Sequence, residues 1–233
     1  MNLTAVKGGK PGPLNTTDLF ASNNPWGFPT VGNDGHIEPP QLWPYNINTG
    51  RSPAVQQAAV HFYFDDGQFE SAWSNPRRAL LYVTRFRWAI TPAFSICSHW
   101  PTSLQLFNTY RSRWVGAYWR QYNQMVIPAV RWAGPASLQF AFDGIKRGST
   151  VAISTVGVKG TEATKDHVRG LEAMLATVQP SNVLCYGRML YDTGHMLGDI
   201  GIPVTEYPTY WEMKRAGQFE GSSSKLARLR ERS

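Results

Sequence analysis

Hydrophobic positions along this chain alternate between short apolar runs and longer stretches with a helical period. A strand is predicted around Phe94–Cys97, in FSICSHW, and another over residues 126–131, in MVIPAVRW. Between them, large apolar residues recur at steps of three, four or seven and so share one face of a long helix: Leu104, Phe107, Trp114, Tyr118 and Tyr122. Two buried strands joined by a helix form a crossover unit, and such units build parallel sheets.

The same alternation continues on both sides of this unit. Asn75-Pro76 predicts a helix start, because a capping side chain precedes a proline in the first turn, and the apolar positions that follow are Ala79, Val83, Phe86 and Ile90. A later helix has its apolar positions at Val168, Leu171, Leu175 and Val178. Further strands are predicted in VHFYF, TVAIST, NVLCYG and IPVTEY, whereas ASLQFAFDGI fits a short helix or a strand.

About six strands with helical crossovers predict an α/β fold with a mainly parallel sheet. The regular succession of crossovers favours an incomplete TIM-barrel-like (β/α) arrangement with fewer than the usual eight units. An open doubly wound sheet is the alternative, because periodicity does not distinguish a curled sheet from an open one. We expect this α/β domain to span residues 59–215.

Residues 1–58 and 216–233 differ from the domain between them. In the first segment Gly, Pro, Asn and Thr interrupt regular structure, yet several large apolar residues are present: Trp26, Phe28, Leu42, Trp43 and Tyr45. We expect an irregular arm that packs these side chains onto the domain, and an arm that binds a partner is the alternative. The final segment is a basic tail.

Composition limits the class of protein. The chain has 233 residues, enough for one α/β domain with a substantial core, and its 42% hydrophobic and 17% charged content argues against disorder. No apolar run approaches the roughly 20 residues that span a bilayer, and the N-terminus lacks a signal core, so we expect a cytoplasmic protein. Cys97 and Cys185 lie in predicted strands, which predicts buried reduced thiols.

Several cofactor motifs are absent from the sequence. There is no phosphate-binding loop, nucleophile elbow, zinc-binding HExxH or dinucleotide glycine fingerprint. Two cysteines cannot form a paired-cysteine cluster, and no metal-ligand spacing is present. The sequence therefore assigns neither a cofactor nor a metal.

Charge is distributed unevenly along the chain, which has a net charge of +7. No acidic residue lies between Glu70 and Asp143, and that interval contains eight arginines but no lysine: Arg77, Arg78, Arg85, Arg87, Arg111, Arg113, Arg120 and Arg131. A guanidinium binds phosphate or carboxylate through two parallel hydrogen bonds. These arginines therefore suit an anionic partner, unless they pair with carboxylates outside the interval or are solvated on helix surfaces.

Polar residues follow nearly every predicted strand. In a parallel sheet the carboxyl ends of the strands share one rim, where functional groups gather. Read in chain order, the residues at these positions are Asp65, Asp66, Ser98, His99, Arg131, Trp132, Ser154, Thr155, Tyr186, Gly187, Glu206 and Tyr207. We expect binding residues among them at Arg131, Trp132, Ser154 and Tyr186.

The carboxylates among these residues are the candidate catalytic groups. Asp65 and Asp66 are adjacent, and two carboxylates can divide into an acid and a base when their environments separate the pKa values. Glu206 is a candidate second acid. The structural alternative is that one aspartate caps the turn and the other pairs with an arginine, while Glu206 is merely exposed.

The long helix contributes the other candidate binding residues. In NTYRSRW, Arg111 and Arg113 could lie along a phosphate backbone, with nearby rings such as Trp114 available for stacking. The alternative places Trp114 and Tyr118 in the core and the arginines outside as solubilising groups.

Several blocks of this sequence are similar to one known family. FDDGQFESAW, TPAFSICSHWPTSLQLFNTYRSRWVGAYWRQ, VIPAVRW, FDGIKRGSTVAISTVGV and VLCYG, which together cover roughly residues 60 to 190, resemble the domain of unknown function numbered 4417. That resemblance implies a protein of a phage, mobile element or bacterium, located in the bacterial cytoplasm. It supplies no catalytic residues.

Three functional hypotheses fit these features. The first is a phage or mobile-element protein that binds DNA or RNA, with Arg111, Arg113 and Arg131 on phosphates and Trp132 or Tyr186 stacked on a base or sugar. The second is a hydrolase- or transferase-type enzyme that uses Asp65 or Asp66 with Glu206. The third is a non-catalytic protein that binds a host factor through its aromatic arm.

Overall fold

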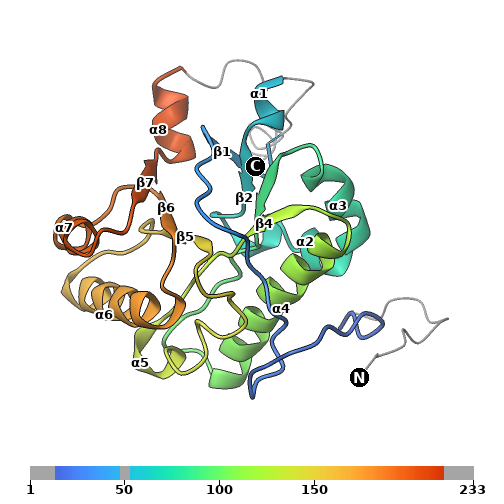
Figure 1. Ribbon diagram of the computed structural model, residues 1–233, viewed down its shortest axis with the longest axis horizontal. Coiled ribbons are helices and arrows are strands. Elements are labelled where there is room, and N and C mark those ends of the chain that lie inside the picture. The colour runs from blue at the N-terminus through green and yellow to red at the C-terminus, as the bar shows by residue number, and fades with distance from the viewer. Residues whose placement is uncertain (1–13, 48–52, 218–233) are drawn as a thin grey trace, which may run out of the picture.

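The computed structural model describes residues 14–47 and 53–217 and shows an α/β architecture (Figure 1). Seven strands lie in these residues: β1 (Leu42–Pro44), β2 (Ala59–His61), β3 (Trp88–Ile90), β4 (Met125–Ile127), β5 (Thr150–Ser154), β6 (Asn182–Tyr186) and β7 (Val204–Tyr207). The helices are α1 (Pro53–Gln56), the 3-10 helix η1 (Asp66–Gln68), α2 (Ser71–Ser74), α3 (Pro76–Val83), α4 (Thr102–Gln121), α5 (Gly134–Ser137), α6 (Thr161–Val178), α7 (Tyr191–Asp199) and α8 (Tyr210–Arg215).

All strand pairing within the two sheets is parallel, as the crossover pattern predicts. One sheet has the order β1-β2-β3-β4 and the other the order β5-β6-β7. A parallel bridge between Ala129 and Ala152 joins them, with the Val130 N–H donating to the Ala152 carbonyl at 2.8 Å. The strands therefore follow one another in chain order. Among the described residues β7 does not pair with β1, so the prediction of an incomplete barrel-like arrangement is confirmed.

One hydrophobic cluster takes residues from every strand or its immediate continuation. It includes Leu42, Ala59, Ile90, Ile127, Ala152, Leu184 and Tyr207. Side chains alternate across a strand, so the next residues along each strand face the helices instead. A shared interior for seven strands shows that the sheet is curled, with the helices outside it.

The helices form an outer layer in two groups (Figure 1). Helices α2, α3 and α4 cover one side and bury a cluster that includes Val60, Phe62, Trp114 and Trp119. Helices α5, α6 and α7 cover the other side, over Val151, Ile153 and Val183. The interpretation that places Trp114 and Tyr118 in the core is confirmed, because their exposed fractions are 1% and 6%. Its other half, which places the arginines outside, is wrong for Arg111 and Arg113, because both are buried.

The strand predicted around Phe94–Cys97 is wrong, because the third strand of the sheet is Trp88–Ile90. Phe86 and Ile90 fit the helical spacing of the preceding segment, but α3 ends at Val83 and a turn follows, in which the Phe86 N–H donates to the Val83 carbonyl. In the segment 94–97, the Ser95 N–H donates to a side chain rather than to a neighbouring strand. Cys97 is therefore half-buried outside a strand, whereas Cys185 is buried in β6.

The N-terminal segment is less irregular than its composition predicts, because it contributes β1 to the sheet. Its other apolar residues pack on the domain: Phe28 is 2% exposed, and the Trp26 ring meets Phe140 edge-on at 6.0 Å. Residues 1–13 and 48–52 of the expected arm, and residues 218–233 of the expected tail, lie outside the described residues.

Residues 31–37 close the amino ends of the strands. The Asn33 side chain donates to the Thr150 carbonyl at 2.9 Å and accepts from the Thr150 N–H at 2.9 Å. Ile37 is bonded from both directions, since its N–H donates to the Thr150 hydroxyl and its carbonyl accepts from Asn182. None of the described helices is long and apolar enough to cross a bilayer.

Candidate functional site

The two predicted catalytic aspartates lie in different environments after β2. Asp66 accepts hydrogen bonds from the Ser95 N–H, at 2.9 Å to its Oδ2, and from the Ser95 hydroxyl, at 2.9 Å to its Oδ1. Asp65 is exposed, and its Oδ2 accepts from the Gln68 side-chain amide at 3.4 Å. Asp66 therefore ties the loop after β2 to the segment after β3, which is a structural task.

A chain of polar contacts continues from Ser95 to the predicted phosphate ligand Arg111. The Ser95 carbonyl accepts from Asn108 at 2.6 Å, and the Asn108 side-chain oxygen accepts from Arg111 at 2.7 Å. Arg111 also donates to both carboxylate oxygens of Glu70 at 2.9 Å, and its guanidinium lies 3.8 Å from the centre of the Phe94 ring. Both terminal nitrogens of its guanidinium are thus engaged inside the fold, whereas its buried Nε has no hydrogen-bond partner within the described residues.

Arg113 is buried more deeply, with 2% exposure. Its guanidinium donates to three backbone carbonyls, those of Ala129 at 3.1 Å, Ala141 at 2.8 Å and Asp143 at 3.1 Å. Burial lowers the pKa of Arg113 to about 10, which leaves it charged at neutral pH. Arg113 thus joins α4 to the chain after β4 and to residues 141–143, and it presents no charge to solvent.

Three further predicted binding residues each donate a hydrogen bond to a backbone carbonyl of the protein. Arg131 is half-buried and donates to the Ala93 carbonyl at 3.0 Å. Trp132 donates its ring N–H to the Asp166 carbonyl at 3.1 Å, and its ring lies against Gly170, where a Cβ would clash with it. The Ser154 hydroxyl donates to the Tyr186 carbonyl at 3.2 Å.

Tyr186 belongs to a stack of rings at the carboxyl end of the curled interior. Its ring lies 5.2 Å from that of Tyr63 and 4.5 Å from that of His61. Its hydroxyl accepts from the Tyr210 N–H at 2.9 Å. Burial raises the pKa of Tyr186 and of Tyr63, so both phenols stay neutral. These rings fill the mouth of the barrel-like interior.

His61, like Tyr63, is a member of this stack that was not among the candidate site residues. It is fully buried, its Nδ1 accepts from the Tyr63 N–H at 3.2 Å, and burial lowers its pKa to about 3. Within the described residues its Nε2 and the Tyr63 hydroxyl have no hydrogen-bond partner. The period of two in AVHFY, which places residues 59, 61 and 63 on one face, was the available signal.

Glu206 does not join the aspartates. It is exposed, its Oε1 accepts from the Met189 N–H at 2.7 Å, and its Oε2 lies 3.6 Å from Arg188. In the described part of the chain no hydrogen bond or ion pair links Glu206 to Asp65 or Asp66, and no cluster of three or more His, Cys, Asp or Glu suits a metal ion. The predicted acids therefore do not meet.

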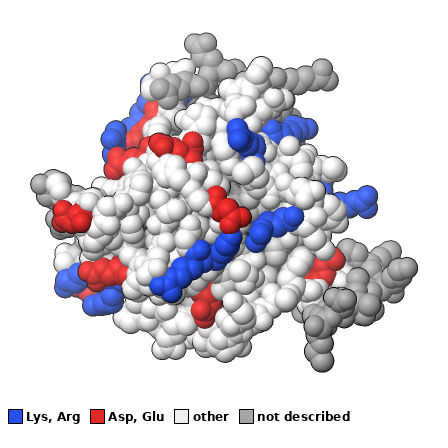
Figure 2. All heavy atoms as spheres, in the orientation of Figure 1, with Lys and Arg blue, Asp and Glu red and all other residues white. Residues whose placement is uncertain are grey.

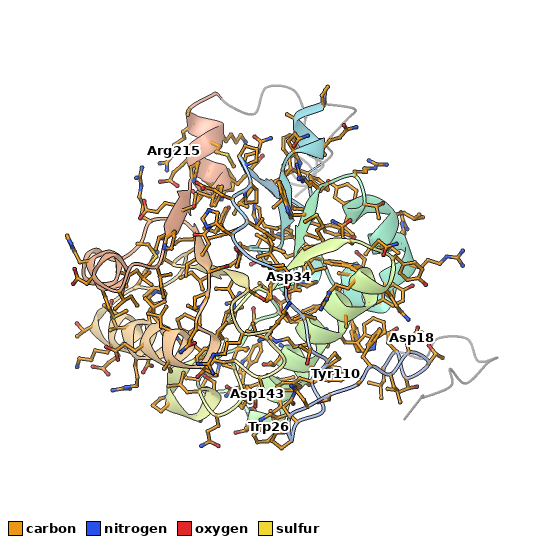
Figure 3. The ribbon with its side chains drawn as sticks, in the orientation of Figure 1. Asp18, Trp26, Asp34, Tyr110, Asp143 and Arg215 are labelled. Carbon is orange, nitrogen blue, oxygen red and sulfur yellow. The ribbon has the colours of Figure 1, made fainter. Side chains whose placement is uncertain are left out.

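The amino ends of the strands show a different surface. Four exposed cations lie there: Arg87 directly before β3, Arg120 in the last turn before β4, and Lys146 and Arg147 in the turn before β5. We call these four residues the basic stripe. Figure 2 shows a band of Lys and Arg side chains across this face, and Figure 3 labels Asp34 and Asp143 on it.

One acid interrupts the basic stripe. Asp34, whose side chain is 91% exposed, forms an ion pair with Lys146. The hydrogen bond and charge of Lys146, with a smaller contribution from the charge of Arg120, hold the pKa of Asp34 below its usual value. Arg147 donates through its Nε to the Gln179 side chain at 2.8 Å, an uncharged partner. Arg87, Arg120 and Arg147 form no ion pair within the described residues.

Comparison with known proteins gives a family but no activity. Residues 20–207 match the family described as a domain of unknown function (DUF4417), so the match includes most of the N-terminal segment as well as the blocks that carry the resemblance. The chain is 39% identical over 210 residues to the Gene 1 protein of Mycobacterium phage L5, covering 89% of each.

A second relative comes from another phage. The Gene 1 protein of Mycobacterium phage D29 is 38% identical over 210 residues, which cover 89% of this chain and 76% of the relative. No solved structure matches. Both the family match and these identities extend over most of the chain, and the chain therefore belongs to the phage-associated DUF4417 family.

Proposed function

We propose that this protein binds nucleic acid through the basic stripe at the amino ends of β3, β4 and β5. The observation that carries this proposal is the position of Arg87, Arg120, Lys146 and Arg147, four exposed cations before three neighbouring strands. Phosphate backbones are recognised by such clustered, solvent-accessible Lys and Arg side chains.

The spacing of the basic stripe suits a chain of phosphates. Neighbouring strands lie about 4.8 Å apart, so three of them place their preceding residues across roughly 10 Å before the reach of the side chains is added. Phosphates of one strand of duplex DNA recur about every 3.4 Å along the helix axis. The stripe can therefore meet several phosphates of one strand.

The proposal retains the expectation of DNA or RNA binding but changes the residues that carry it. Arg111 and Arg113 are engaged with Glu70 and with backbone carbonyls, and Arg131 donates to the Ala93 carbonyl. A guanidinium whose hydrogen bonds and charge are already compensated gains little from a phosphate. Exposed arginines without a carboxylate partner are the better ligands.

A salt titration tests this proposal. Binding of fluorescent duplex and single-stranded oligonucleotides is measured by anisotropy for the natural protein and for a triple variant, Arg87→Gln, Arg120→Gln, Arg147→Gln. Each lost phosphate contact should reduce the slope of log affinity against log salt by about 0.9 for duplex and about 0.7 for single strands.

The matched control removes the same charge elsewhere. Arg169, Arg188 and Arg215 are exposed and lie outside the basic stripe, with Arg215 on α8 in Figure 3. The variant with all three changed to Gln should keep the natural slope. The proposal would be overturned if both triple variants lost the same amount of salt slope, or if the natural protein bound no oligonucleotide at low salt.

A further inference from the structure

A groove of about 440 Å³ lies on the outside of the domain, between the loop after β1 and helices α2 and α3. It is lined by Tyr45, Ser71, Asn75, Arg78 and Tyr82. Its volume falls within the range of about 300–1,000 Å³ that is typical of small-ligand sites. None of these residues is among the candidate catalytic or nucleic-acid-binding residues drawn from the sequence, although Tyr45 belongs to the expected aromatic arm and Arg78 to the acid-free interval.

Two tyrosine rings line this groove, and each is held in place by its neighbours. Tyr45 and Tyr82 meet edge to face, with ring centres 5.0 Å apart. Tyr45 is supported from behind by Phe62 at 4.7 Å, and the Tyr82 hydroxyl donates to the Ile47 carbonyl at 2.7 Å. Because these rings are held by the core and by the backbone, a planar group can stack on them at little entropic cost.

The polar residues of the groove favour an anionic, hydrogen-bonding ligand. Arg78 is exposed and has no carboxylate partner in the described part of the chain. Ser71 and Asn75 are also exposed, and Asn75 caps α3, so the positive end of that helix lies at the groove. Among the residues that the structure describes, none of those lining the groove is acidic.

Two arginines follow the groove residue Tyr82 along the chain, and the second of them belongs to the basic stripe. The guanidinium of Arg85 lies over the Tyr82 ring, 5.5 Å from its centre. Arg87, the first member of the stripe, is two residues further along the chain and lies over the Trp88 ring at 4.7 Å. A strand whose phosphates follow the stripe can therefore extend past Arg85 into the groove.

We infer that this groove binds an unpaired base of a single-stranded nucleic acid, stacked on Tyr45 or Tyr82, with the adjoining phosphate on Arg78. The inference rests on the proposed function, since the stripe holds the rest of the strand. A base inside a duplex is already stacked on both faces and cannot enter the groove. The protein should therefore use the groove for single strands and not for duplexes.

The test blocks the groove without touching the basic stripe. Ser71→Trp places a ring in the groove, and Arg78→Gln removes the one charged side chain that lines it among the described residues. Their matched controls are Ser74→Trp on the same short helix and Arg77→Gln on α3, since both residues are exposed and neither lines the groove. Affinity for a twelve-residue oligothymidine and for a duplex of equal length is measured for each variant at one salt concentration.

Loss of one stacked base should weaken oligothymidine binding about tenfold in Ser71→Trp. Arg78→Gln should also weaken oligothymidine binding. The duplex affinity of both variants, and both affinities of the two control variants, should equal those of the natural protein. Retained duplex binding also reports that the variants are folded, and Arg78→Gln serves alone if Ser71→Trp does not fold. Unchanged oligothymidine binding in the groove variants would overturn this inference and leave the proposed function standing. No binding of either oligonucleotide by the natural protein would overturn both.

Discussion

The two ends of the parallel strands use similar side chains for opposite purposes. At the carboxyl ends Asp66 is bonded to Ser95, and Arg131 donates to the Ala93 carbonyl. At the amino ends Arg87 and Arg120 are exposed. The two ends differ in the number of hydrogen-bond partners near these side chains. Loops that cross the carboxyl ends bring backbone carbonyls and polar side chains close to them. An arginine is available to a partner only where the fold has not already given it acceptors.

The largest expected effect is on stability, at Arg113. Arg113→Lys should lower the free energy of unfolding by about 3 kcal/mol, because an ammonium cannot bond all three carbonyls and each buried acceptor left unbonded costs about 1–3 kcal/mol. Urea unfolding measures this loss. Arg120→Lys is the control at the exposed end of the same helix, and its change should stay within about 0.5 kcal/mol. Equal small losses in both variants would remove the contrast between the two ends.

An intermediate effect is expected from His61 as the pH falls. Its pKa is about 3 in the folded protein and 6.5 when unperturbed, so the unfolded chain binds the proton first. This contribution to stability is complete above about pH 6.5 and is lost toward pH 3, by up to about 1.4 kcal/mol per pH unit. Urea midpoints at pH 7 and pH 5 measure it. His61→Gln should flatten the dependence, whereas a wild-type slope in that variant would exclude His61 as its source.

The smallest expected effect on stability is at Asp34, on the amino-end face. Asp34→Asn removes an exposed ion pair and should change the free energy of unfolding by less than about 0.5 kcal/mol. It also frees Lys146 for a phosphate, which should steepen the salt slope of duplex binding by up to about 0.9. Anisotropy titrations compare it with Glu172→Gln, which removes an exposed acid from α6. The same slope in both variants would show that Lys146 takes no part in binding.

The pattern of apolar residues predicts most of the architecture but misplaces the third strand and misses β1 in the N-terminal segment. Five of the predicted strands and the helices α3, α4 and α6 are present, because their apolar periods reflect faces that are buried against one another. The missed strand Trp88–Ile90 has only three residues and continues a helical spacing. Its position depends on burial between β2 and β4, which no local pattern records.

The candidate site was less predictable than the fold. Helix α4 has polar residues at Asn108, Arg111 and Arg113, and on a two-sided surface helix these would face solvent. They are buried because Ser95, Glu70 and the carbonyls of residues 129, 141 and 143 surround them. Those partners lie up to 41 residues away, so only the tertiary structure shows which arginines remain free.

The closure of the amino ends by residues 31–37 has a consequence for biosynthesis. Asn33 and Ile37 are made early, but their partners Thr150 and Asn182 leave the ribosome more than a hundred residues later. Domains generally fold as units during synthesis, from the N-terminus onward. Residues 31–37 therefore cannot form these hydrogen bonds until β5 and β6 have been synthesised, so they dock onto the amino ends of these strands only after the second sheet has begun to form.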